Sequence, residues 1–295
     1  MAEARSHVVR TLDGRSLDFI EVGAHYGPVL VAHHGTPGAG RLYRSEIESA
    51  ERRGLRLIAY DRPGYGSSTP HPERSVADAA HDVAAILDSL GVERFATYGW
   101  SGGGPHALAC AALLAGRCVA AATIAGVGPA DAADLDWLAG MGEGNIAEFA
   151  AARAGRERLI QYCRADADGI MAAGPEQLAD AFRPHLSEVD SQALTGELAA
   201  FLLESITTGL RSGVDGWVDD DFAFLAPWGF DVETIQSPVL VWQGEQDLMV
   251  PADHARWLRR HLARAEGPVL PDEGHLTLFA NRVGDAHEWL QARLS

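Results

Sequence analysis

Short apolar runs alternate with helix-like stretches in the first part of the chain. The apolar runs lie at residues 28–32, 56–60, 95–98 and 119–124. Residues 75–90 carry apolar side chains at the spacing of one helical face, and Gly91 is expected to end that helix. The alternation predicts an α/β fold with a mostly parallel central sheet flanked by helices.

The pattern changes after Gly126. Residues 128–230 contain helical stretches and no convincing strand. Strand and helix then alternate again, with a strand at 238–242, a helix near 253–262, a strand at 268–270 and a final helix at 282–294. We therefore expect one α/β core, made of residues 1–127 and 233–295, interrupted by an inserted α-helical domain at residues 128–232.

Composition and charge narrow the range of partners. The chain has 295 residues, 47% of them hydrophobic, which is enough to bury a large core. Its formal net charge of −17 disfavours nucleic acid and anionic membrane surfaces as partners, but says little about an uncharged small-molecule substrate, which we expect. The N-terminus lacks the apolar core of a secretory signal, and no apolar run is long enough to span a bilayer. The sequence does not indicate an oligomeric state.

Three cysteines, Cys110, Cys118 and Cys163, occur without C-x-x-C spacing. An odd number in this pattern favours a reducing compartment and argues against a zinc site or a disulfide framework. We expect three buried, inert thiols, a cytoplasmic location, and no metal or cofactor.

The segment around Ser101 contains the pattern G-x-S-x-G, between an apolar strand and an alanine-rich helix. A sharp strand-to-helix turn projects the serine oxygen above the sheet, and crowding there requires the small residues Gly99 and Gly103. An overlapping G-x-G-x-x-A pattern begins at Gly102. A dinucleotide site would need an acid at the end of the next strand, which instead ends in Ala125-Gly126. Ser101 is therefore predicted to be a nucleophile.

A serine nucleophile needs a histidine to take its proton and a carboxylate to orient that histidine. Asp247 follows a predicted strand, and His275 lies in a predicted loop after a further strand, so the chain order is Ser, Asp, His. Glu245 is the alternative acid. The alternative histidines, His254, His261 and His287, fall in helical stretches, where packing or solvated roles are usual.

The loop after the first apolar run is the candidate oxyanion hole. It reads His33-His34-Gly35-Thr36-Pro37-Gly38, and Pro37 has no N–H to donate. We expect the backbone N–H groups of Thr36 and Gly102 to stabilise the oxyanion, with His34 bracing the loop.

Five motifs together resemble those of the α/β-hydrolase superfamily, in its serine-nucleophile, esterase- and lipase-like branch. They are the H-G-x-P-G loop at 34–38, the D-x-P-G-x-G-x-S turn at 61–68, the serine turn at 99–103, the G-x-x-D turn at 244–247, and Gly274-His275. The resemblance implies that the helical insertion is a cap over the active site. Epoxide hydrolases and haloalkane dehalogenases of this fold carry an aspartate where this chain has Ser101, so the resemblance implies acyl transfer to water.

The sequence leaves several activities open. The leading hypothesis is a carboxylic ester hydrolase acting on a small or medium apolar ester. Proline-iminopeptidase-like amide cleavage, lactone opening, C–C bond hydrolysis and cofactor-free perhydrolysis need the same three residues, and a non-enzymatic binding protein is disfavoured by their presence. Amide cleavage would need carboxylates in the insertion to hold a free amine, for which the candidates are Glu143, Glu148 and Glu204. The run Asp219-Asp220-Asp221 is expected to be a solvated loop rather than a metal site.

Overall fold

The structure is a computed structural model, and it describes residues 4–294. Nine strands form one sheet: β1 (Arg5–Arg10), β2 (Ser16–Gly23), β3 (Val29–His33), β4 (Arg56–Tyr60), β5 (Phe95–Trp100), β6 (Cys118–Ile124), β7 (Val239–Gly244), β8 (Ala265–Glu266) and β9 (Val269–Leu270). Their order is β1-β2-β4-β3-β5-β6-β7-β8, with β9 also paired to β7. Only β1 and β2 run antiparallel to their neighbours, which confirms the predicted α/β fold class.

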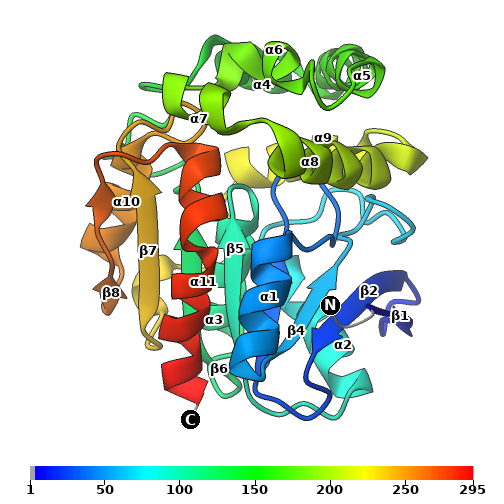
Figure 1. The fold of residues 1–295 in the computed structure, drawn as a ribbon, viewed down its shortest axis with the longest axis vertical. Coiled ribbons are helices and arrows are strands. Elements are labelled where there is room, and N and C mark those ends of the chain that lie inside the picture. The colour runs from blue at the N-terminus through cyan, green and yellow to red at the C-terminus, as the bar shows by residue number, and fades with distance from the viewer. Residues whose placement is uncertain (1–3, 295) are drawn as a thin grey trace.

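Five α-helices cover the two faces of the sheet: α1 (Arg44–Arg53), α2 (Asp78–Ser89), α3 (Gly103–Leu113), α10 (Ala252–His261) and α11 (His275–Leu294). Helices α1 and α11 pack on one face, in front of the sheet in Figure 1. Helices α2, α3 and α10 pack on the other. Because both faces are covered, the central strand β3 is buried along its whole length, which explains its continuous apolar sequence.

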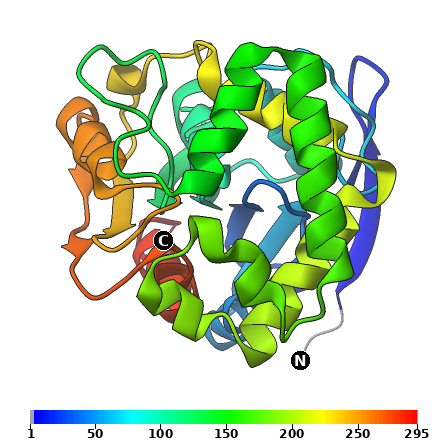
Figure 2. The same cartoon turned by 90° about the horizontal axis from the view of Figure 1, so that it is seen from above.

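The segment between β6 and β7 contains the other six α-helices of the described chain. They are α4 (Glu143–Ala154), α5 (Arg156–Ala172), α6 (Leu178–Phe182), α7 (Glu188–Ala193), α8 (Gly196–Gly209) and α9 (Asp215–Leu225), with short 3₁₀ helices at Arg183–His185, Leu210–Ser212 and Val232–Thr234. Figure 1 shows these helices above the carboxyl ends of the parallel strands, and Figure 2 looks down onto them. We call this segment the helical insertion; its predicted boundaries at 128 and 232 stay a prediction.

Two expectations about local structure are wrong. His275 is not in a loop but begins α11, seven positions before the predicted start of the last helix. Asp219, Asp220 and Asp221 are not a solvated loop but lie buried within α9. In both cases the reason is a contact between segments that are distant in sequence, described below. The three cysteines are buried and unpaired, as predicted.

None of the helices in residues 4–294 combines the length and the apolar character needed to cross a membrane.

Candidate active site

Ser101 lies on a strained turn between β5 and α3. Its φ of +55° is in the left-handed region, which costs a non-glycine residue about 1–3 kcal/mol. The Ser101 N–H donates to the carbonyl of Ile124 at 2.9 Å, which fixes the turn against the neighbouring strand. A Cβ on Gly99 would lie 2.0 Å from the carbonyl oxygen of Gly103, and one on Gly103 would lie 2.2 Å from that of His33. The predicted need for small neighbours is therefore met at both positions.

His275 and Asp247 form the hydrogen-bonded pair that the sequence predicts. The His275 Nδ1 lies 2.8 Å from Asp247 Oδ2, and both side chains are buried. The other carboxylate oxygen, Oδ1, accepts the N–H groups of Met249 and Val250, each at 2.8 Å, while Gln243 donates to Oδ2. Asp247 therefore cannot rotate away from the imidazole without losing several hydrogen bonds.

The alternative residues have other partners. Glu245 is bound to Arg256 at the surface, away from His275. His254 is buried between the N–H of Gly128 and the carbonyl of Trp137.

The pKa of His275 is raised above its usual value. Burial by itself disfavours the imidazolium form of His275, but the Asp247 carboxylate outweighs that effect.

The loops that carry Thr36 and Gly102 are in contact, because a Cβ on Gly102 would lie 2.4 Å from Thr36 Oγ1. Within residues 4–294 neither backbone N–H donates to a backbone acceptor. Their role as the oxyanion hole stays a prediction. His34 braces this loop as predicted, with its ring between the carbonyl of Gly35 and the N–H of Arg62.

Arg62 and Asp220 fasten the Thr36 loop to the insertion, and sequence reasoning missed both. Arg62 donates to the carbonyls of His34 and Gly35 and to Thr36 Oγ1. Asp220, on α9, accepts from Arg62 at 2.6 Å and from the Thr36 hydroxyl at 2.7 Å.

Two further donors complete the surroundings of Asp220. Arg74 donates to it at 2.7 Å and the Tyr65 hydroxyl at 2.9 Å. Although burial opposes its ionisation, the two guanidinium groups hold the pKa of Asp220 well below its usual range. Asp220 is therefore a fully matched buried charge.

Asp190 makes a second link from the insertion, to the start of α11. It is fully buried, and its carboxylate accepts the N–H groups of His275 and Leu276 at 2.8 Å and that of Thr277 at 3.1 Å. These are N–H groups of the first turn, which a helix cannot satisfy internally. Asp190 thus caps α11 from a distant segment and fixes the backbone of His275. In the sequence, Asp190 looks the same as any exposed aspartate in a helical stretch. No sequence pattern could therefore have identified its role.

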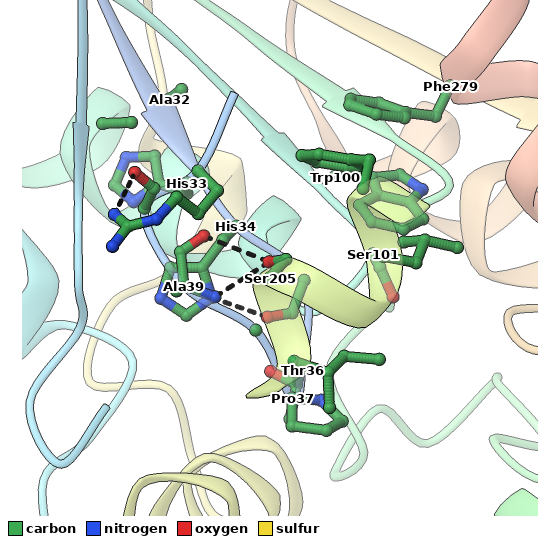
Figure 3. Close-up of a pocket in the computed structure, with 18 of the residues that line it drawn as sticks. Ala32, His33, His34, Thr36, Pro37, Ala39, Trp100, Ser101, Ser205 and Phe279 are labelled. Atoms are coloured by element: carbon green, nitrogen blue, oxygen red, sulfur yellow. Dashed lines mark hydrogen bonds between the residues drawn. The ribbon is translucent and has the colours of Figure 1, made fainter. Parts of the chain in front are cut away.

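One cavity beside Ser101 is mainly apolar. It measures about 740 Å³ with its open mouth, and Ser101, His275 and Thr36 all line it. The Phe, Tyr and Trp rings in its wall are Tyr98, Trp100, Phe182, Phe201 and Phe279, and the buried carboxyl group of Glu46 lies beside Tyr98. Trp100 and Phe279 are stacked with their ring centres 4.6 Å apart, and Figure 3 shows them at one end of the cavity, with the Thr36–Pro37 turn at the other.

A second cavity also reaches Ser101 and is lined by carboxyl groups. It measures about 640 Å³ with its mouth, and its wall includes Ser101, Gly102 and Thr36. Three carboxyl groups line it, those of Glu148, Asp166 and Asp221. Of the three glutamates that the sequence offered for an amine, only Glu148 lies in this wall, whereas Glu143 and Glu204 are exposed. Among residues 4–294, no group of three or more metal-ligating side chains is placed to hold a metal ion.

The sequence model described as "alpha/beta hydrolase fold" matches residues 28–281, most of the chain. The chain belongs to the α/β-hydrolase family.

Individual relatives of this hydrolase are distant. It is 30% identical, over 268 residues, to the dihydrolipoyllysine-residue acetyltransferase component of the acetoin cleaving system of Pseudomonas putida, with 89% of this chain matching 62% of that longer protein. It is 25% identical over 258 residues to the pimeloyl-[acyl-carrier protein] methyl ester esterase of Nitrosomonas europaea, covering 84% of this chain and 89% of that protein. A thermophilic esterase from Thermogutta terrifontis superposes with a TM-score of 0.71 at 22% identity, covering 99% of this chain and all of that one, which shows the shared fold.

Proposed function

We propose that this α/β hydrolase is a serine hydrolase that cleaves small or medium carboxylic esters through an acyl-enzyme. The observation that carries the proposal is the arrangement of three residues. Ser101, on its strained turn, lines the same cavity as His275, whose Nδ1 is hydrogen-bonded to Asp247 at 2.8 Å. A base oriented by a buried carboxylate beside a projecting hydroxyl is what nucleophilic acyl transfer requires.

The chemistry runs in two steps. The Ser101 oxygen attacks the ester carbonyl carbon while its proton passes to His275, and the N–H groups of Thr36 and Gly102 stabilise the oxyanion. The intermediate collapses by losing the alcohol, which takes the proton back from His275. Water then attacks the acyl-enzyme in the same way, so that one ester and one water give one acid and one alcohol. Asp247 stabilises the imidazolium in both steps.

The surroundings of Ser101 favour an apolar group on the substrate. The wall of the first cavity is mainly apolar and contains five Phe, Tyr and Trp rings, and its size suits a small or medium ligand. Two of the rings, Phe182 and Phe201, come from the insertion, which is consistent with residues 128–232 acting as a cap over the active site. The names of two relatives, a methyl ester esterase and a thermophilic esterase, agree with ester cleavage.

Amide cleavage is the second candidate. Its specific support is the position of Glu148 in the second cavity, where a free amine of the substrate would meet a carboxylate. Lactone opening, C–C hydrolysis and perhydrolysis use the same residues, and no separate observation favours them.

Two measurements test the proposal. A fluorophosphonate probe should label the wild-type protein, and Ser101→Ala should abolish labelling and lower p-nitrophenyl butyrate hydrolysis by at least about 10³-fold. A wild-type protein that the probe does not label would overturn the serine-hydrolase assignment. Turnover of Pro-amides without turnover of esters would favour the second candidate.

A further inference from the structure

Glu148 and Asp221 form a buried pair of carboxyl groups in the second cavity. Asp221 is 1% exposed and Glu148 is 8% exposed, and the two groups interact directly. Glu148 accepts a hydrogen bond from the Trp217 indole N–H at 2.5 Å. Within residues 4–294, neither oxygen of Asp221 receives a hydrogen bond from a donor group. Asp221 is therefore a buried side chain in the wall of a cavity, and its partner there is another carboxyl group rather than a cation.

The pair has no matching positive charge. The two neighbouring aspartates on α9 each have a positively charged partner. Asp219 pairs with Arg156, and Asp220 pairs with Arg62 and Arg74. Within residues 4–294 no hydrogen bond or ion pair joins Arg74 to Asp221, because the two terminal guanidinium nitrogens of Arg74 bond Asp220 and two backbone carbonyls. Burial makes the ionised pair costly and raises the pKa of Glu148 to about 7. A bound cation would remove that cost.

The other walls of the cavity also suit an organic cation. Phe149, Trp217 and Phe224 line it, and the faces of aromatic rings attract cations. Asp166 adds a third carboxyl group to the same wall. An alkylammonium group carries three N–H donors and an apolar stem, so it can bond carboxylates while its stem packs against rings. The described residues offer no site with metal-ligand geometry here.

The cavity leads to the proposed nucleophile. Ser101, Gly102 and Thr36 line the same cavity as Glu148 and Asp221, so a molecule attached to Ser101 shares this space with the carboxyl pair. We propose that Glu148 and Asp221 bind a protonated amine of the substrate, and that this hydrolase acts on esters or amides bearing an ammonium group. The substrate assignment rests on the proposed function, whereas binding of the amine does not.

Matched substrates test the assignment. L-Alanine methyl ester is compared with methyl isobutyrate, and methyl 6-aminohexanoate with methyl heptanoate; in each pair a methyl group replaces the ammonium. The measured quantity is the ratio of kcat/KM within a pair at neutral pH. An ammonium group can make an ester intrinsically more reactive, and that effect is the same for every protein. The ratio of each variant is therefore compared with the ratio of the wild type. We expect Asp221→Asn, and independently Glu148→Gln, to lower it by about tenfold in at least one pair.

Asp219→Asn is the matched control, because it removes a neighbouring buried carboxylate of α9 that does not line the cavity. The control should keep the wild-type ratio. Ratios that are unchanged by Asp221→Asn and Glu148→Gln in both pairs would overturn the assignment of the amine as a substrate group.

A binding measurement separates the subsite from the catalytic proposal. Ser101→Ala protein, which needs no turnover, is titrated with n-butylammonium and with n-butanol, and its thermal unfolding is followed. Selective stabilisation by n-butylammonium that is lost in Ser101→Ala/Asp221→Asn supports the subsite, even if no ester is cleaved and the proposed function fails. Equal responses to the two compounds would overturn the subsite, even if esters are hydrolysed.

Discussion

Asp220 and Asp221 are adjacent residues of α9 with opposite surroundings. Both are buried, but Asp220 meets two guanidinium groups and two hydroxyls, while Asp221 meets another carboxyl group. A buried carboxylate with matched charge holds segments together, and its neighbours depend on it. One without a matching charge is costly to the fold, and such a cost is commonly found where a ligand binds. The same helix thus fastens the insertion to the core on one side and faces the cavity on the other.

Asp190 belongs with Asp220 in this comparison. Asp220 holds the Thr36 loop, and Asp190 holds the backbone N–H groups of His275 and Leu276. The insertion therefore supports both halves of the proposed machinery, the oxyanion loop and the histidine. We infer that its removal would disturb catalysis as well as substrate choice.

The largest effect on stability should come from Asp220. Asp220→Ala leaves Arg62 and Arg74 buried without a counter-charge, so we expect the free energy of unfolding to fall by about 3–5 kcal/mol. Asp221→Ala removes a buried carboxyl group that has no counter-charge, and it should change the free energy of unfolding by less than about 1 kcal/mol. Urea denaturation of the two variants measures the difference.

Should Asp220→Ala fail to fold, Asp220→Asn keeps one acceptor oxygen for the Tyr65 and Thr36 hydroxyls but loses the charge and the oxygen that accepts from Arg74. It should still be less stable than Asp221→Asn. Equal losses for the two asparagine variants would show that the comparison is wrong.

Asp190→Asn should act on His275 in two ways. An amide offers one acceptor oxygen where the carboxylate accepts three backbone N–H groups, so we expect kcat/KM for p-nitrophenyl butyrate to fall by about 10- to 100-fold. The negative charge of Asp190 also helps to raise the pKa of His275, so its removal should lower that pKa. The base is then neutral at lower pH, and the acid limb of the pH profile should move to lower pH.

A purely structural role would lower activity without moving the acid limb. Glu188→Gln, on the exposed side of the same helix, is the control and should keep both the rate and the profile. An unshifted acid limb in Asp190→Asn would limit Asp190 to a helix-capping role.

The sequence predicts the buried parts of the fold well because burial leaves a periodic signal. The run at 56–60 coincides with β4, and the helix at 75–90 contains α2, which ends at Ser89 just before Gly91. Strands β1 and β2 were missed because both lie at the antiparallel end of the sheet. Half-buried positions alternate with exposed ones in β1 and mostly with buried ones in β2, so no continuous apolar run forms.

The site was predictable only where chemistry depends on local spacing. Ser101, Asp247 and His275 follow turns that can be recognised in the chain, and the structure brings Asp247 and His275 into hydrogen-bond contact. The roles of Asp190 and Asp220 depend on partners 85 and 158 positions away. Three consecutive aspartates resemble a solvated loop unless those partners are known, which is why this prediction was wrong.

The smallest effect should be a pH dependence that comes from the Glu148–Asp221 pair. Burial raises the pKa of Glu148 from 4.5 to about 7 and that of Asp221 well above its usual value. The folded state then binds more protons than the unfolded chain in this range, so its stability must fall as the pH rises from about 5 to about 8. In Asp221→Asn one of the two titrating groups is gone, and we expect the loss of stability between these pH values to be smaller by about 1 kcal/mol.

Urea denaturation at about pH 5 and about pH 8 measures this loss of stability. Asp168→Asn, at an exposed position on α5, is the control and should lose as much stability as the wild type. If wild type and Asp221→Asn lose the same stability, the pair is not the buried, proton-sharing group that the amine subsite requires.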